Sequence, residues 1–268
     1  MPLPQRYRTA VRFAGIVLTV TATALPTNAG SEVRVIGADD RQVIDSSDPP
    51  WVSVGRVNRS GRAFCTGILI APDKVLTAAH CVYDSALGQW APANEIHFLA
   101  GYTRGEYVDH ALAASYAVAD GYDRTRGQEM ATMLRDWAII TLDHPMAVAA
   151  TPIWPLAFED LVPALASGTL LQAGYSGDHP HMLSVHEDCD LVGLSGGSPL
   201  FYHQCDAIEG DSGSPLLLRI DGRYGVVGLH IAQGISEGME LGLAIPSSAF
   251  AASIRNWVGE DAVAPPPL

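Results

Sequence analysis

A hexapeptide in the second half of the chain, Gly-Asp-Ser-Gly-Ser-Pro at residues 210–215, carries a residue suited to nucleophilic attack. Glycines near Ser212 allow a tight turn that exposes the serine hydroxyl and leaves neighbouring backbone N–H groups free to bind an anion. Such turns also occur in ordinary hairpins. A nucleophile therefore requires a base from elsewhere in the chain.

His80 is the candidate base, in Thr-Ala-Ala-His-Cys at residues 77–81, after an apolar run at 66–70 and a Pro-Asp turn. Together with the turn at Ser212, this motif resembles the chymotrypsin-like serine peptidases, in the same chain order of His, Asp and Ser. The resemblance covers about residues 35–258. It implies an all-β fold of two six-stranded antiparallel β-barrels around an interfacial cleft, with a C-terminal helix, and hydrolysis of peptide bonds in proteins or peptides.

The third member of the triad is a carboxylate that fixes the histidine tautomer. The aspartates between the two motifs include Asp84, Asp109, Asp120, Asp123, Asp136 and Asp143. Asp136 stands at the head of an apolar run, residues 137–142, and this pattern is similar to the aspartate site of the family. Asp136 is the predicted partner of His80, and Asp123 is the second choice.

With these roles, Ser212 attacks a peptide carbonyl, His80 takes the serine proton and passes it to the leaving amine, and Asp136 orients His80. The backbone N–H groups of Gly210 and Ser212 would hold the oxyanion. No cofactor or metal is expected for this chemistry.

Four residues are candidates for the substrate pocket: Asp206, Ala207, Glu209 and His230. His230 matches the histidine with which the glutamyl-endopeptidase branch of the family binds an acidic side chain. Ala207 departs from that branch, which usually has a hydroxyl residue there, and Glu209 would repel an acidic substrate. Asp206 lies six positions before Ser212, where trypsin-type members bind Arg or Lys, although it can also hydrogen-bond within its turn. Acidic and basic preferences both remain open.

Maturation is suggested by Val35-Ile36-Gly37 after Arg34, which looks like the activation site of the family. Cutting there would remove a short propeptide, residues 30–34, and free an amino group on Val35 to pair with Asp211, as in a zymogen. The alternative is an N-terminal strand with no switching role.

The composition and the first residues favour export. Residues 1–29 have a basic head, a short apolar segment and a small-residue cleavage site, which together predict a signal peptide. The 268-residue chain has 16 Lys and Arg against 29 Asp and Glu, a net charge of -13. This balance disfavours a nucleic-acid partner and an anionic membrane. We expect a secreted or periplasmic monomer that has no membrane contact once the signal peptide is removed.

Four cysteines in an exported chain are expected to form two disulfides. Three pairings are possible. Cys65 and Cys81 bracket the His80 segment, as in the resembled family, and Cys189 and Cys205 bracket a hairpin-like stretch, so we predict these sequence-local pairs. Each closes a loop of about 16 residues, which corresponds to roughly 3 kcal/mol of stabilisation in the chain-entropy estimate. No Cys-x-x-Cys spacing suggests a zinc site.

Short β-branched and aromatic runs separated by Gly, Asn and Ser predict many strands. The expected strands cover residues 51–57, 64–70, 96–100, 107–110, 138–142, 170–174, 214–220, 224–231 and 242–245. We expect a peptidase domain at 35–258, with the first barrel at about 35–142, a proline-containing linker at about 143–158 and the second barrel at about 159–246. A helix is predicted at 248–258, capped by Ser247 or Ser248, with Phe250, Ile254 and Trp257 on one side. Residues 259–268 are expected to be a disordered tail.

Two other functions compete with hydrolysis of peptides. Residues 193–197 fit the Gly-x-Ser-x-Gly pattern of esterases, but the next residues favour a loop and another strand instead of the helix that this motif requires. A secreted binding protein that keeps the peptidase fold without hydrolysis is the stronger alternative, since fold and activity are separable.

Overall fold

The structure is a computed structural model that describes residues 35–59, 63–127, 129–193, 198–236 and 238–267. The expected signal peptide, the expected propeptide and most of the esterase-like motif lie outside these residues. The strands are β1 (Gln42–Ile44), β2 (Val54–Arg59), β3 (Ala63–Ala71), β4 (Lys74–Thr77), β5 (Tyr83–Asp84), β6 (Gln89–Trp90), β7 (Ile96–Ala100), β8 (Asp109–Val118), β9 (Ala138–Leu142), β10 (Thr169–Gly174), β11 (Leu183–Glu187), β12 (Leu191–Val192), β13 (Phe201–His203), β14 (Pro215–Ile220), β15 (Arg223–Ser236) and β16 (Met239–Pro246). The α-helices are α1 (Met130–Met133), α2 (Phe158–Ala164) and α3 (Ser247–Val258), and the 3-10 turns are η1 (Trp51–Ser53), η2 (Ala79–Val82), η3 (Ala93–Glu95), η4 (Arg124–Arg126) and η5 (Glu260–Ala262).

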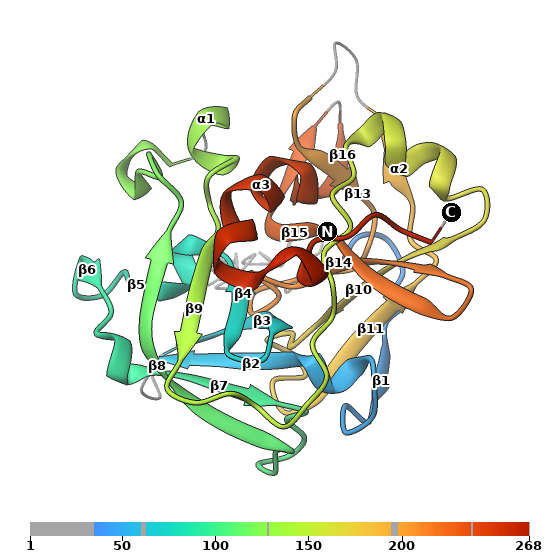
Figure 1. Cartoon of the computed structure of the whole chain (residues 1–268). Coiled ribbons are helices and arrows are strands. Elements are labelled where there is room, and N and C mark those ends of the chain that lie inside the picture. Colours follow the sequence, from blue (N-terminus) through green and yellow to red (C-terminus); the bar gives the residue numbers. More distant parts are fainter. Residues whose placement is uncertain (1–34, 60–62, 128, 194–197, 237, 268) are drawn as a thin grey trace, which may run out of the picture. The chain divides into compact units, whose positions relative to one another are not determined.

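Six strands of the first half close into an antiparallel barrel in the order β2, β3, β4, β9, β8 and β7 (Figure 1). Side chains alternate along its strands, so in β7 Ile96, Phe98 and Ala100 are buried while the residues between them are partly exposed. The barrel interior is apolar. Its core includes Leu69 and Val75.

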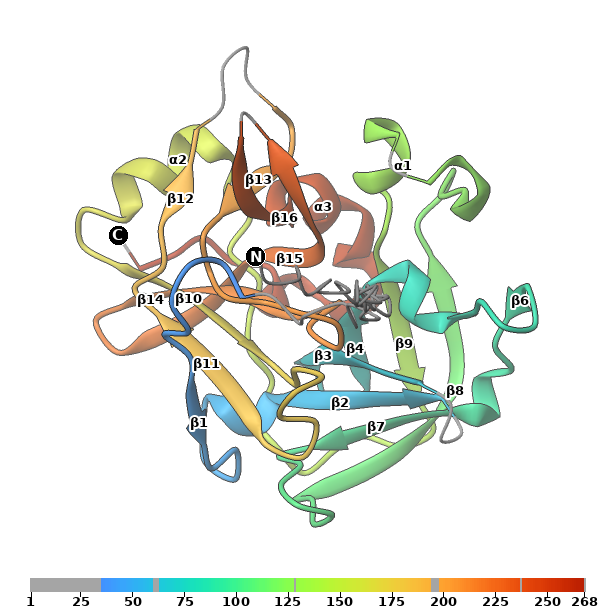
Figure 2. The same ribbon diagram turned by 180° about the vertical axis from the view of Figure 1, so that it is seen from behind.

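The second half forms a sheet in the order β1, β11, β10, β14, β15, β16, β13 and β12. Six of these strands, from β11 to β13, are contiguous in the sheet, with β1 added at one edge and β12 at the other. Figure 2 shows β1 lying beside β11, so the N-terminal segment crosses over to the second half. The expected all-β class, with a six-stranded barrel and a C-terminal helix, is confirmed.

One apolar cluster joins the two halves. It contains Val54 and Ile68 from the first barrel together with Leu171, Tyr175 and Leu229 from the second half of the chain, all fully buried. The two halves of the chain therefore share one contiguous apolar core. The candidate site is built where these two halves meet.

Two details of the predicted C-terminus were wrong. Ser247 does not cap α3, because its hydroxyl donates to the Trp154 carbonyl and accepts the Leu156 N–H, which leaves Pro246 at the N-cap. The segment after α3 is held in place, because Val263 is buried and forms a bridge with Ile153.

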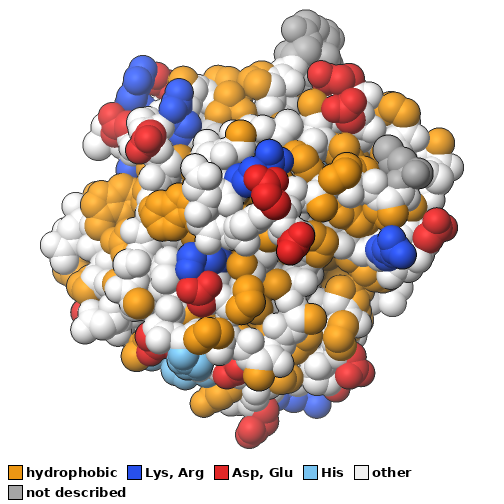
Figure 3. All heavy atoms as spheres, viewed as in Figure 1, with side chains coloured by type: hydrophobic (Ala, Val, Ile, Leu, Met, Phe, Trp, Pro, Cys, Tyr) orange, Lys and Arg blue, Asp and Glu red, His pale blue; other side chains and the backbone are white. Residues whose placement is uncertain are grey.

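Both expected cysteine pairs are bonded, Cys65 with Cys81 and Cys189 with Cys205. Among the described residues, no helix combines the length and the apolar character needed to cross a membrane. On the face shown in Figure 3, the coloured Lys and Arg side chains are scattered among apolar and acidic ones and form no continuous basic stripe.

Candidate active site

His80 lies in η2, directly after β4, and is joined to Asp136 by two hydrogen bonds. The backbone N–H of His80 donates to Oδ1 of Asp136 at 2.9 Å, and the ring Nδ1 lies 2.7 Å from Oδ2. The side chains are 19% and 13% exposed. An ionised carboxylate only accepts hydrogen bonds, so a neutral His80 ring carries its proton on Nδ1. The Nε2 lone pair is then available as a base.

The second-choice aspartate has a different role. Asp123 is partly exposed and caps η4, where its Oδ1 accepts the N–H of Thr125 at 2.9 Å and the Thr125 hydroxyl at 2.6 Å. Of the two predicted partners, the structure brings Asp136 to His80 and keeps Asp123 in a local turn.

Thr66, on β3, ties the turn of Ser212 to the first barrel. Its backbone N–H donates to the Ser212 carbonyl at 2.9 Å, and its hydroxyl donates to the Gly210 carbonyl at 3.1 Å. The carbonyl of Thr66 accepts the hydroxyl of Thr77 at 2.7 Å, three residues before His80. The segments that carry the serine and the histidine are therefore both bonded to one buried residue, which sequence reasoning missed.

Glycine is required on both sides of Ser212. Gly210 and Gly213 have φ angles of +100° and +82°. A Cβ at Gly210 would lie 2.5 Å from the Tyr175 carbonyl oxygen, and a Cβ at Gly213 would lie 2.3 Å from the Thr66 carbonyl oxygen. Within the part of the chain that the structure describes, the amides of Gly210 and Ser212 donate no hydrogen bond.

The side chain of Asp211 points away from the solvent and is fully buried. Its Oδ2 accepts the backbone N–H of Ile208 at 2.8 Å, and its Oδ1 accepts the hydroxyl of Ser176 at 3.0 Å. Burial raises the pKa of Asp211 to about 7, although both hydrogen bonds and the charge of Arg41 act to lower it. This carboxylate immediately precedes the candidate nucleophile.

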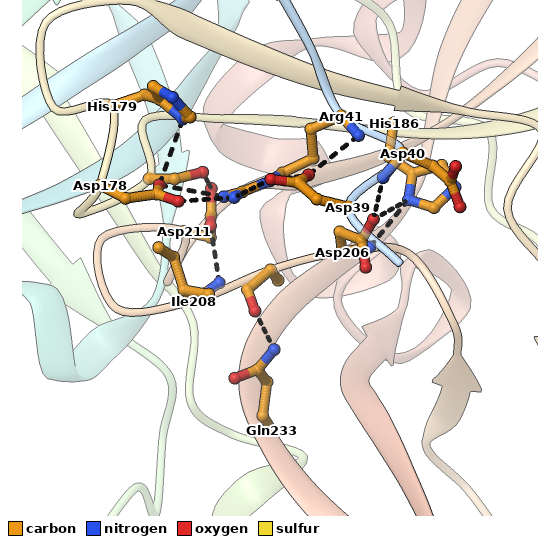
Figure 4. Close-up of polar contacts among 12 residues, drawn as sticks. Asp39, Asp40, Arg41, Asp178, His179, His186, Asp206, Ile208, Asp211 and Gln233 are labelled. Carbon is orange, nitrogen blue, oxygen red and sulfur yellow. Dashed lines mark hydrogen bonds and ion pairs between the residues drawn. The ribbon is translucent and has the colours of Figure 1, made fainter. Parts of the chain in front are cut away.

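Asp206, a candidate for binding basic substrates, is buried and faces the N-terminal segment. Its Oδ2 accepts the Asp40 N–H at 2.8 Å and lies 3.1 Å from Nδ1 of His186 (Figure 4). Its own N–H donates to the same ring nitrogen at 2.9 Å. Burial raises the pKa of Asp206. One carboxylate oxygen is therefore occupied by the protein itself.

His230 is buried on β15 and contacts a second histidine that the sequence did not reveal. Nδ1 of His230 lies 3.1 Å from Nε2 of His203, on β13. Burial lowers the pKa of His230 to about 3 and that of His203 well below its usual value, so both rings are neutral near pH 7. Gly242 makes room for this pair, because a Cβ there would lie 2.1 Å from the His203 ring.

The remaining pocket candidates lie on the same loop. Ala207 is fully buried and its carbonyl accepts a hydrogen bond from the side-chain amide of Gln233. Glu209 is exposed, and its carbonyl accepts the Gly177 N–H at 2.6 Å. Gln233 therefore bridges β15 to the loop of Ala207. Its partner is 26 residues away, so no local signal identified it.

Possible metal ligands are already engaged with one another. Asp40, His186 and Asp206 bring ligand atoms within 4.8 Å of each other, but His186 and Asp206 share the contacts given above. Cys65 and Cys81 lie near His80 with their sulfurs in a disulfide. We assign no metal to either group.

The closed β-barrel, the second antiparallel sheet, the His80–Asp136 pair and the glycine-flanked Ser212 together define the class of double-barrel serine peptidases. Residues 21–182, more than half of the chain, match the model of the family described as Trypsin. The chain belongs to the trypsin family. The match includes His80 and Asp136.

Several known proteins are similar to the chain. Glutamyl endopeptidase of Bacillus licheniformis is 24% identical over 206 residues, covering 71% of this chain and 62% of the relative, so the chain spans less than two thirds of that protein. Glucanase inhibitor protein 4 of Phytophthora infestans is 25% identical and covers 91% and 94% of the two chains. A solved Glu endopeptidase in complex with MPD has a TM-score of 0.67 and 26% identity, covering 84% of this chain and 99% of its own. The Vibrio cholerae VesB protease, at 24% identity and a TM-score of 0.62 over 83% and 67% of the two chains, shares the fold.

Proposed function

We propose that the chain is an exported serine endopeptidase with His80, Asp136 and Ser212 as its catalytic residues. The observation that carries this proposal is the paired bonding of Asp136 to the ring and the backbone of His80, at 2.7 and 2.9 Å. Such a carboxylate holds the imidazole in one orientation and stabilises the imidazolium that forms during the reaction. The bonds from Thr66 to the Ser212 turn support the second half of the arrangement.

In the first step, the Ser212 hydroxyl oxygen bonds to the substrate carbonyl carbon while its proton moves to Nε2 of His80. The backbone N–H groups of Gly210 and Ser212 donate to the negative carbonyl oxygen. The peptide C–N bond then breaks, the amine leaves with the proton from His80, and an ester remains on Ser212. Water, deprotonated by His80, hydrolyses this ester and restores the hydroxyl.

Ser212→Ala tests this mechanism. Removing the nucleophile of a triad leaves only the contribution of the oxyanion site and of substrate binding, so turnover of a peptide substrate is expected to fall roughly four or more orders of magnitude. The variant and the wild type should be purified in parallel from the secreted fraction and matched for circular dichroism. Equal turnover, with contaminating protease excluded, would refute the nucleophile assignment.

We propose a preference for acidic side chains on the amino side of the cleaved bond. The neutral histidine pair supports this: if His203 Nε2–H donates to His230 Nδ1, the His230 Nε2–H is left as a hydrogen-bond donor for a carboxylate. Asp206 is less suited to binding a cation, since Oδ2 accepts the Asp40 N–H. The names of the Bacillus licheniformis relative and of the solved Glu endopeptidase agree with this preference. Cleavage of a peptide library predominantly after Arg or Lys would contradict it.

A second candidate function is a secreted protein that binds another protein and does not hydrolyse it. The relative named Glucanase inhibitor protein 4, which aligns with 91% of this chain, favours this candidate. A silent binding protein would show no turnover in the library experiment at any residue. It would give identical results for the wild type and Ser212→Ala.

Export is proposed from the predicted signal peptide at residues 1–29. The two disulfides support it, because such bonds persist in oxidising compartments. N-terminal sequencing of the protein recovered from the culture medium or the periplasm tests the cleavage position.

A further inference from the structure

A three-residue segment of the N-terminal chain, Asp39-Asp40-Arg41, lies across two loops of the second half. We call residues 39–41 the strap. Asp40 donates its N–H to Asp206, at the start of the loop that ends at Ser212 (Figure 4). β1 continues directly from the strap and pairs with β11, from Gln42 to Ile44. The strap is thereby fastened to the sheet on one side and to the loop of Asp206 on the other.

Arg41 is the centre of the strap. Its Nε and Nη2 donate to the two carboxylate oxygens of Asp39, each at 2.9 Å, and its Nη1 and Nη2 donate to the two oxygens of Asp178 at 3.1 and 2.6 Å. Bidentate pairs of this kind are the strongest and most directional ion pairs in proteins. The Arg41 side chain is only 3% exposed although the two aspartates are partly exposed. A buried guanidinium of this kind is a fixed cation and not a mobile surface charge.

Asp178 belongs to a tight turn that is hydrogen-bonded to the segment just before the candidate nucleophile. The N–H of His179 donates to the Ser176 carbonyl at 2.9 Å, which closes the turn of residues 176–179. Within this turn, the Ser176 hydroxyl donates to Asp211 at 3.0 Å and the Gly177 N–H donates to the Glu209 carbonyl at 2.6 Å. The turn thus holds both residues that flank Gly210.

The Asp211 side chain is closely surrounded and has little room to move. Gly174 stands beside it, where a Cβ would lie 2.3 Å from Oδ1 of Asp211 and 2.1 Å from Oγ of Ser214. The charge of Arg41 acts to lower the pKa of Asp211, and the charge of Asp178 acts to raise it. Figure 4 shows the Arg41 guanidinium between Asp39 and Asp178.

We propose that Arg41 is a positioning residue that orders the turn at Gly210 and Ser212 through Asp178 and Ser176, so that the oxyanion site forms without a new amino group on Val35. This inference rests on the proposed peptidase function. The sequence left two alternatives for the N-terminal segment: a new Val35 amino group that pairs with Asp211, or a strand with no switching role. The inference favours the second alternative. Arg41 already links the strap to the turn of residues 176–179 through Asp178, and this turn bonds Asp211 through Ser176, so cleavage after Arg34 is not needed to order the turn at Ser212.

The test compares the rate at which a fluorophosphonate probe labels four secreted proteins, each expressed from the complete sequence. These are the wild type, Arg41→Gln, Arg41→Lys and Arg34→Gln. The matched control is Arg219→Gln, which removes another Arg–carboxylate contact, with Glu187 at 3.1 Å, on the surface of the second sheet. Circular dichroism and thermal unfolding establish that each protein is folded.

Losing a complete oxyanion donor lowers turnover about 10²- to 10³-fold, so a misplaced turn should lower the labelling rate and kcat of Arg41→Gln by roughly 10- to 100-fold. We expect KM to change much less than kcat. Arg41→Lys retains the charge and should recover part of the loss, whereas a merely structural role would not discriminate between Lys and Gln at equal stability. Arg34→Gln and Arg219→Gln should be labelled at the wild-type rate.

Ser176→Ala provides an independent arm if Arg41→Gln does not fold, because it removes only the hydroxyl that bonds Asp211. The same decrease in kcat is expected. Wild-type labelling rates in folded Arg41→Gln and Ser176→Ala would overturn the inference, and so would loss of labelling in uncleaved Arg34→Gln. A wild type that is not labelled at all would instead contradict the proposed function.

Discussion

Thr66 and Ser212 are joined by a backbone hydrogen bond of 2.9 Å that connects the first barrel to the turn of the candidate nucleophile. The side chain of Thr66 extends this link, because its hydroxyl donates to the Gly210 carbonyl and accepts the Tyr175 N–H. One buried residue therefore positions a serine that is 146 residues further along the chain. The relationship explains how a site can be assembled from two separate halves.

Thr66→Val is expected to destabilise the protein by about 1–3 kcal/mol, because the Tyr175 N–H loses its acceptor in a buried place while the side-chain volume is kept. Urea unfolding measures this change. The activity should fall as well, since the Gly210 carbonyl loses its donor. Thr141→Val, at a half-buried threonine of β9, is the matched control and should change stability by less than about 1 kcal/mol. Equal stability of the two variants would show that the Thr66 hydroxyl has no such role.

Asp136→Asn is expected to lower kcat by about 10⁴-fold, the loss typical of this substitution in a serine peptidase triad, because an asparagine amide can hold His80 in the wrong tautomer. The fold should be unaffected, since the substitution preserves shape. Steady-state kinetics with one acidic peptide substrate measure the change. Asp123→Asn, in the exposed turn of η4, should retain wild-type kcat. The reverse result would exchange the roles of the two aspartates.

Asp211→Asn is expected to increase stability at neutral pH. The unfolded chain releases the Asp211 proton near the ordinary pKa of 3.8, whereas burial raises the folded-state pKa to about 7. Between these values the folded state binds more protons, so the free energy of unfolding decreases as the pH rises from 4 to 7. The resulting penalty above pH 7 is on the order of 4 kcal/mol.

Asparagine does not ionise and avoids this penalty. Urea unfolding of Ser212→Ala and of the double variant Ser212→Ala/Asp211→Asn, from pH 4.5 to pH 8, excludes self-digestion. The difference in free energy should favour the asparagine variant at pH 8 and shrink toward pH 4.5. A difference that is independent of pH would mean that Asp211 is ionised at an ordinary pKa.

His203→Leu is expected to lower kcat/KM for cleavage after Glu by about 10-fold, because a hydrogen bond to the neutral His230 ring contributes roughly 1–1.5 kcal/mol. His203→Gln retains an N–H that can donate to His230 and should preserve most of the activity. Cleavage after an uncharged residue serves as the internal reference, and should be reduced less. If both variants cut glutamyl substrates as the wild type does, His203 has no part in substrate recognition.

The parts of the fold that could be predicted are those that local sequence patterns determine. Alternation and apolar runs predicted the bounds of β7 and β9 to the residue, and glycines marked the turns around Ser212. At residues 51–53, the aromatic and β-branched residues form η1 instead of a strand, and the strand expected at 107–110 starts at Asp109 and runs to Val118. Local propensity does not decide such short segments, because packing overrides it.

The parts of the site that could not be predicted depend on contacts between distant residues. Arg41 meets Asp178 across 137 positions, and His203 meets His230 because their strands lie on either side of β16. No spacing in the sequence encodes such neighbours. His80 and Asp136, by contrast, belong to motifs that point to the same chemistry independently, and the structure brings them together.

The central claim is that Ser212 is a nucleophile activated by His80. The most direct measurement is peptide mapping by mass spectrometry after treatment with a fluorophosphonate, in the wild type and in His80→Ala. We predict a single stoichiometric adduct on Ser212 in the wild type and a strongly reduced adduct in His80→Ala. An unmodified Ser212 in folded, secreted wild-type protein, or equal modification in both proteins, would contradict this claim.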